Sequence, residues 1–96
     1  MVNVFVGVLT VKIWMKESAS LKDRRRVIRS YLDRAKSRFN VSIAEIDTGE
    51  RYQHATLAIS CVGGEQGVLR NVLETVLRKM ESSTRAEIVH SFIEIR

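Results

Sequence analysis

Apolar and polar side chains alternate along some stretches of the chain and recur every three or four residues along others. Alternation with a period of two is typical of β-strands, and recurrence at three or four is typical of amphipathic helices. The predicted elements are strands at Val2–Met15, Asn40–Asp47, Tyr52–Val62 and Arg85–Arg96, and helices at Ser20–Phe39 and Val68–Met80. Their order along the chain is βαββαβ.

This order is that of the split βαβ, or ferredoxin-like, arrangement. We therefore expect an α+β fold: a ferredoxin-like sandwich in which a four-stranded antiparallel sheet carries two helices on one face. The chain has 96 residues and no stretch with the composition of a linker, so we expect a single domain over residues 1–96. A hydrophobic fraction of 45% and a charged fraction of 28% indicate a folded domain rather than a disordered chain.

One face of the predicted sheet is left open because both helices cover the other. Alternation assigns Leu9, Val11 and Ile13 to the helix side of the first strand. Apolar side chains on the open side are more often buried between two copies of a chain than left in water. We expect a homodimer, with an interface that contains Val4, Val6, Val8, Trp14 and Tyr52.

The positive charge of the protein is concentrated in the first predicted helix. The net charge is +5 and the pI is about 9.9, which favours nucleic acid, an anionic membrane or an acidic partner. The segment Ser20–Phe39 carries a charge of +6, because it holds eight cations and two acids. The cations are Lys22, Arg24, Arg25, Arg26, Arg29, Arg34, Lys36 and Arg38.

The start of this helix follows a capping-box pattern, with Ser20 as the N-cap and Asp23 three residues later. The carboxylate therefore occupies the positive first turn, and the consecutive arginines follow beyond most of the reach of the helix dipole. At roughly 100° per residue, most of the cations fall on one shoulder of the helix, and Arg34 and Arg38 lie near the other. Arg24 falls within the apolar arc, so we expect it to extend past the sheet or to pair with an acid such as Glu17.

Two interpretations of this basic helix stay open. Charge runs on helices are commonly solvated faces. The alternative is a stripe that contacts phosphates, and the excess of arginine over lysine, six to two, suits phosphate oxygens. A role at a membrane surface is disfavoured because the helix has no apolar face to spare for insertion. The residues predicted to bind nucleic acid are Lys22, Arg24, Arg25, Arg26, Arg29, Lys36 and Arg38.

Other residue types give weaker signals. His54 and His90 lack metal-ligand spacing, and Cys61 lies on the inward side of its strand, as a buried and inert thiol would. The turn "GGEQG" lacks the lysine and serine of a P-loop, so a plain turn is favoured over an anion site. We therefore expect a non-enzymatic domain with no metal and no cofactor. An enzyme acting on a small phosphorylated substrate stays open as an alternative.

Three segments resemble the YlxP-like family of small uncharacterised bacterial proteins. They are "VGVLTVKIWMKESASLKDRRRVIRSYLDRAKSRFNVSIAEID", "YQHATLAIS" and "AEIVHSFIEI". Tyr52 and His54 depart from the family pattern, which tends to have Trp and then Arg or Lys there. The resemblance implies a ferredoxin-like fold. Genes of this family often lie near those for ribosome-binding factor A and translation initiation factor two.

The gene neighbourhood of the family favours RNA or a ribosomal subunit as the partner of the basic helix. A homodimeric protein-interaction or structural module without a nucleic-acid role is the alternative. The apolar runs are shorter than the roughly 20 residues that a membrane span needs, and no signal-peptide pattern is present. Together with the single cysteine, this favours a cytoplasmic protein that does not bind a membrane.

Overall fold

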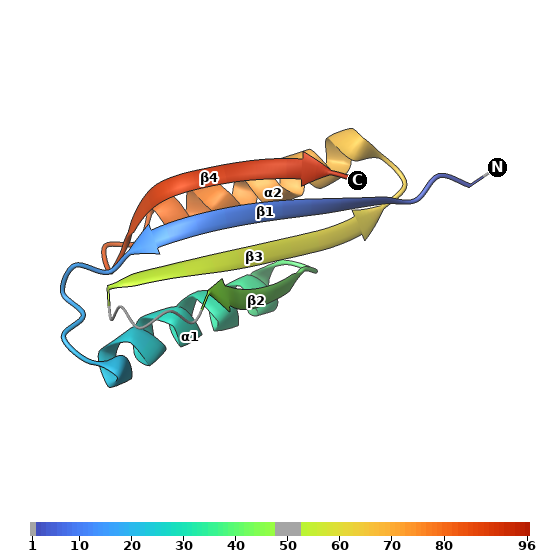
Figure 1. The fold of residues 1–96 in the computed structure, drawn as a ribbon. Helices are drawn as coiled ribbons and strands as arrows, with labels where there is room; N and C mark the ends of the chain where they lie inside the picture. Colours follow the sequence, from blue (N-terminus) through green and yellow to red (C-terminus); the bar gives the residue numbers. More distant parts are fainter. Residues whose placement is uncertain (1, 48–52) are drawn as a thin grey trace.

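The computed structural model describes residues 2–47 and 53–96 (Figure 1). Within these residues the elements are β1 Phe5–Trp14, α1 Leu21–Arg38, β2 Ser42–Asp47, β3 His54–Gly63, α2 Gln66–Glu81 and β4 Glu87–Ile95. The predicted βαββαβ order is confirmed. The main differences are at the ends, since β1 begins at Phe5 rather than Val2 and α2 begins two residues before Val68. Tyr52, the predicted start of the third strand, lies outside the described residues.

The four strands form one antiparallel sheet in the order β2-β3-β1-β4. The two helices lie on the same side of it, with α1 along the β2 edge and α2 behind β1 and β4 (Figure 1). This is the predicted ferredoxin-like sandwich. The register is regular at the centre, where Leu9 is opposite Ile59 on one side and Ile93 on the other.

The core lies between the sheet and the helices. The inward side chains of β1 and β3, among them Leu9 and Leu57, are fully buried and pack with Leu73 of α2. Gly7 of β1 lets α2 come close to the sheet, because a Cβ there would lie 2.9 Å from Cδ1 of Leu73. The alternation in the first strand therefore predicted the buried face correctly.

The other face of the sheet is uncovered. Val6, Val8 and Trp14 lie on it and are partly exposed, and Val4 precedes β1 and is exposed. Neighbouring strands add Ile46, Val62 and Phe92, all exposed apolar side chains that the sequence pattern of β1 alone does not reveal. His90 and Phe92, both in β4, also have their ring centroids 5.7 Å apart. The predicted interface residue Tyr52 lies outside the described residues.

Candidate functional site

The start of α1 is capped as its sequence predicts. The backbone N–H of Asp23 donates to Oγ of Ser20 at 3.1 Å, and Ser20 has the extended backbone of an N-cap. The Asp23 carboxylate accepts from the N–H of Ala19 at 3.0 Å, one residue before the position of the usual capping box. This bonding fixes where the helix begins and therefore which cations face outward.

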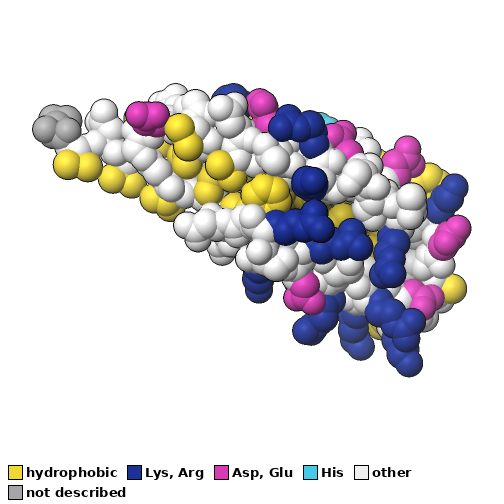
Figure 2. All heavy atoms as spheres, turned by 180° about the vertical axis from the view of Figure 1, so that it is seen from behind, with side chains coloured by type: hydrophobic (Ala, Val, Ile, Leu, Met, Phe, Trp, Pro, Cys, Tyr) yellow, Lys and Arg dark blue, Asp and Glu magenta, His cyan; other side chains and the backbone are white. Residues whose placement is uncertain are grey.

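Five cations of α1 form an exposed stripe, which we call the outer stripe. Figure 2 shows Lys and Arg side chains projecting together along the edge of the molecule where α1 lies. Ion pairs in the described part of the chain join Arg24 to Glu45 and Arg96 to Glu94, so none of them involves the outer stripe. Asp33 is exposed on the same helix, four residues after Arg29 and three before Lys36, and offsets part of this charge, but the stripe stays strongly positive. The outer stripe consists of Lys22, Arg25, Arg26, Arg29 and Lys36.

Arg24 does not belong to this surface. Its side chain is 7% exposed and forms an ion pair with Glu45 of β2. Nε and one terminal nitrogen of its guanidinium also donate to the carbonyl oxygen of His54, at 3.3 and 3.2 Å. Arg24 is among the residues predicted from the sequence to bind nucleic acid, but the structure buries its side chain and pairs it with Glu45 rather than Glu17. The physical reason is its place in the apolar arc, which directs it toward the sheet.

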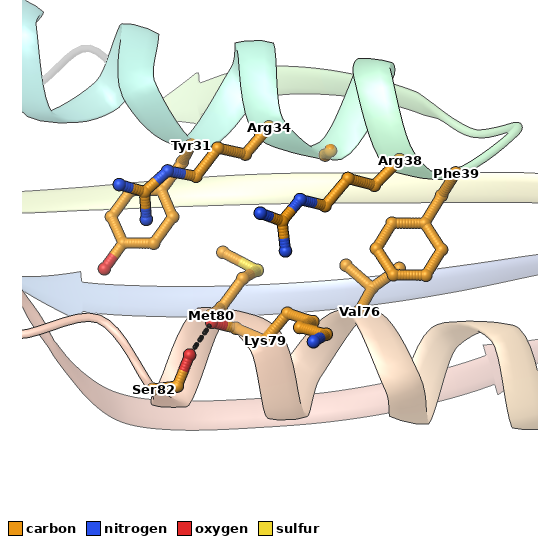
Figure 3. A pocket seen from close by; sticks show the side chains of 9 residues that line it. Tyr31, Arg34, Arg38, Phe39, Val76, Lys79, Met80 and Ser82 are labelled. Carbon is orange, nitrogen blue, oxygen red and sulfur yellow. Dashed lines mark hydrogen bonds between the residues drawn. The ribbon is translucent and has the colours of Figure 1, made fainter.

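A second group of cations lies between the two helices, over a hollow that we call the interhelical groove. The groove has a volume of about 290 Å³. Figure 3 shows that α1 contributes arginines from one side and α2 contributes a lysine from the other. Apolar side chains form its floor, and an apolar strip between the helices is visible in Figure 2. The lining residues are Tyr31, Arg34, Ala35, Arg38, Phe39, Val76, Lys79, Met80 and Ser82.

The groove is positive and has no lining carboxylate. Arg34, Arg38 and Lys79 are exposed, and none of them forms an ion pair with any described residue. Arg38 also lies in the last turn of α1 and Lys79 in the last turn of α2, where cations are favoured by the helix dipole. That effect accounts for the presence of cations at the helix ends, but it does not neutralise them.

Tyr31 adds a polar atom to the same groove. The side chain extends from α1 into the space between the helices (Figure 3), and the residue is 5% exposed. Its hydroxyl oxygen is buried and has no hydrogen-bond partner among the described residues. A buried hydroxyl without a partner costs free energy, so a ligand that supplied a hydrogen-bond partner to this atom would gain affinity.

The sequence predicted part of this arrangement. Arg34 and Arg38 were expected near one shoulder of α1, and both line the groove, so Arg38 is separate from the outer stripe. Lys79 lies on the polar side of its helix pattern, and nothing local pairs it with α1. Only the antiparallel packing of the two helices against one sheet brings Lys79 opposite Arg38, as Figure 3 shows.

The remaining candidates contribute little chemistry. Within residues 2–47 and 53–96, no three His, Cys, Asp or Glu side chains lie close enough to hold a metal ion. Cys61 is buried, and this burial raises the pKa of its thiol above the usual 9.0. Neither described helix has both the length and the apolar character that crossing a bilayer requires.

The turn "GGEQG" leads into α2 beside a second hollow of about 520 Å³. Gly63 and Gly64 line this hollow together with apolar residues of α2. Glu65 is the N-cap of α2, and its side chain makes no capping hydrogen bond. Glu65 places a negative charge where a phosphate cradle would present hydrogen-bond donors. This turn is therefore a weaker candidate for anion binding than the interhelical groove.

Comparisons with known proteins agree with the resemblance seen in the sequence. The chain is similar to "Uncharacterized protein YlxP" of Bacillus subtilis (strain 168), with 28% identity over 82 residues, 85% of this chain and 89% of that protein. Among solved structures, the de novo designed protein Foldit4 is similar in fold, with a TM-score of 0.52 and 18% identity over 98% of this chain and 94% of that one. The model of the family described as "Protein of unknown function (DUF503)" matches residues 6–93. Since that match covers far more than half of the 96 residues, the chain belongs to the DUF503 family.

Proposed function

We propose that this domain is an RNA- or ribosome-associated protein that binds phosphates through the outer stripe of α1. The observation that carries the proposal is that five exposed cations share one helix surface without a carboxylate partner in the described part of the chain. A surface of this kind gains affinity for nucleic acid by releasing counterions from the phosphates. The proposal includes no chemical step.

The dimensions of the stripe suit a polyanion. Lys22 and Lys36 are fourteen residues apart, which corresponds to about 21 Å along a helix that rises 1.5 Å per residue. Several consecutive phosphates of one strand can be contacted over this length. Arginines at Arg25, Arg26 and Arg29 each offer a planar fork that matches phosphate oxygens. Such contacts set position and affinity, and they carry no sequence information directly.

The test is a salt-titrated binding assay against purified ribosomal subunits and total RNA. We expect the affinity of the wild-type protein to fall steeply with salt and to be lost in a variant with Arg25→Glu, Arg26→Glu and Arg29→Glu. The matched control carries Arg70→Glu, Arg78→Glu and Arg85→Glu. It makes the same change in net charge at exposed positions outside α1. Binding by the α1 variant that equals wild type, with circular dichroism confirming its fold, would refute the proposal.

The alternative is a homodimeric protein-interaction module, and the exposed apolar side chains of the open sheet face favour it. Val62 is 68% exposed and Phe92 is 44% exposed, and a second copy stacked on this face would remove both from water. We expect light scattering to give twice the monomer mass at micromolar concentration and Val62→Lys to restore the monomer mass. A monomer mass for the wild-type protein contradicts this alternative.

A further inference from the structure

We propose that the interhelical groove binds a small phosphorylated ligand with a planar, hydrogen-bonding ring, which is the chemistry of a nucleotide. This goes beyond the RNA-binding proposal, because it concerns another side of α1 and shares no residue with the outer stripe. Three features of the groove support this ligand: its cations, its apolar floor and its buried hydroxyl.

The cations identify the charged end of the ligand. Arg34 and Arg38 reach over the groove from α1 and Lys79 from α2, so an anion between the helices can be contacted from both sides (Figure 3). Three cations without a lining carboxylate suit a group with more than one negative charge. A phosphate ester meets this requirement, and its oxygens fit the forked donors of two arginines.

The floor identifies the rest of the ligand. Phe39 is partly exposed and presents apolar surface below the cations, and the nearly buried Val76 and Met80 complete the floor. A bare phosphate ion would leave the surface of Phe39 in contact with water. The hydroxyl of Tyr31 requires a polar partner in the same buried region, which an acyl chain does not have. A heterocyclic base satisfies both demands, because its faces are apolar and its edge carries donors and acceptors.

The size of the groove limits the ligand. A volume of about 290 Å³ is at the lower end of the range of ligand pockets, roughly 300–1,000 Å³. This is space for one small ligand of the size of a nucleoside monophosphate. The groove and the outer stripe therefore differ in what they recognise: the first takes a single compact anion, and the second takes an extended chain of phosphates.

The test measures binding of the four ribonucleoside 5′-monophosphates, adenosine and inorganic phosphate to the full chain, by NMR titration at fixed ionic strength. We expect at least one monophosphate to bind more than tenfold more tightly than either adenosine or phosphate. The amide signals that move should belong to residues lining the groove, such as Arg38 and Lys79. Equal affinity for inorganic phosphate and for all four monophosphates would overturn the proposal, as would signal changes confined to the outer stripe.

Variants separate the three features. Tyr31→Phe keeps the ring and removes only the hydroxyl, and we expect it to weaken nucleotide binding by about threefold to tenfold and to leave phosphate binding unchanged. Arg34→Gln together with Arg38→Gln should weaken nucleotide binding by more than about tenfold. Unchanged nucleotide affinity in either variant would overturn the proposal.

The outer-stripe variant distinguishes this proposal from the RNA-binding one. The protein with Arg25→Glu, Arg26→Glu and Arg29→Glu should bind the monophosphate within about threefold of wild type, since none of these residues lines the groove. Loss of RNA binding with retention of nucleotide binding supports both proposals. Loss of nucleotide binding in this folded variant would overturn the groove proposal alone.

Discussion

The ion pair between Arg24 and Glu45 offers a sharp test of how α1 is held against the sheet. Arg24 comes from the first turns of α1 and Glu45 from β2, and the guanidinium also bonds to the backbone of His54 at the start of β3. Replacing Glu45 by Gln removes the carboxylate of this ion pair and leaves the other contacts of the buried guanidinium in place, among them its hydrogen bonds to His54. We expect this single change to be among the costlier polar substitutions in the protein.

The magnitude follows from burial. Removing one partner of a fully buried ion pair costs roughly 3–5 kcal/mol, because the other charge is left without compensation. The side chain of Glu45 is 21% exposed and Arg24 keeps its other contacts, so we expect a smaller loss of about 2–3 kcal/mol for Glu45→Gln. For a domain of this size, that loss lowers the melting temperature by about 10–20 °C. Arg24→Met should cost less, about 1–2 kcal/mol, because the remaining carboxylate is partly hydrated.

Urea unfolding at pH 7, followed by far-UV circular dichroism, measures both variants and the double variant Arg24→Met with Glu45→Gln. The matched control is Glu81→Gln, which changes an exposed acid without an ion pair among the described residues and should stay within about 0.5 kcal/mol of wild type. A loss below 0.5 kcal/mol for Glu45→Gln would refute the reasoning. Strict additivity in the double variant would also refute it, because residues in contact are expected to couple.

Three further changes test other parts of the structure. Gly7→Ala should cost about 1–3 kcal/mol, because the new Cβ meets Leu73 at 2.9 Å. Gly67→Ala, where a Cβ has no neighbour within 4 Å, should be neutral or stabilise by up to about 1 kcal/mol. Equal urea midpoints for these two variants would contradict this contrast. Ser20→Ala should lower the free energy of unfolding by about 1 kcal/mol through loss of the N-cap bond, and an unchanged value would show that the cap is dispensable. The raised pKa of Cys61 keeps its thiol protonated in the folded state to a higher pH than in the unfolded state, so the stability it contributes is complete below about pH 9 and is lost as pH rises through the raised pKa. Its alkylation by iodoacetamide at pH 8 should therefore be much slower in the folded protein than in urea, and equal rates would contradict the burial.

The fold was predictable because its elements have strong local patterns. In β1, alternation alone places Leu9, Val11 and Ile13 inward, and all three are fully buried. In α2, helical spacing places Leu73 and Val76 on the buried side, as the structure has them. These predictions need only the period of the element, since a strand has two faces and an amphipathic helix has one apolar arc.

The partners of polar residues were not predictable in the same way. The position of Arg24 in the apolar arc indicates that it turns inward, and this follows from local spacing. That its partner is Glu45 depends on how α1 is seated against β2, and its bond to His54 depends on where β3 begins. Neither fact is local to the helix. The interhelical groove could not be predicted from local patterns for the same reason. Lys79 lies near the cations of α1 only because both helices pack on the same sheet.

The orientation of α1 about its own axis also predicts how the two proposed sites differ in their response to salt. Arg34 and Arg38 face α2 beside Tyr31 and lie over an apolar floor, whereas Arg29 and Lys36 face water. All of these cations are exposed, so dissolved ions screen both groups. A polyanion on the outer stripe also releases many counterions, and a single monophosphate releases few. RNA affinity should therefore fall much more steeply than nucleotide affinity over the same salt titration, and parallel slopes would mean that one surface serves both ligands.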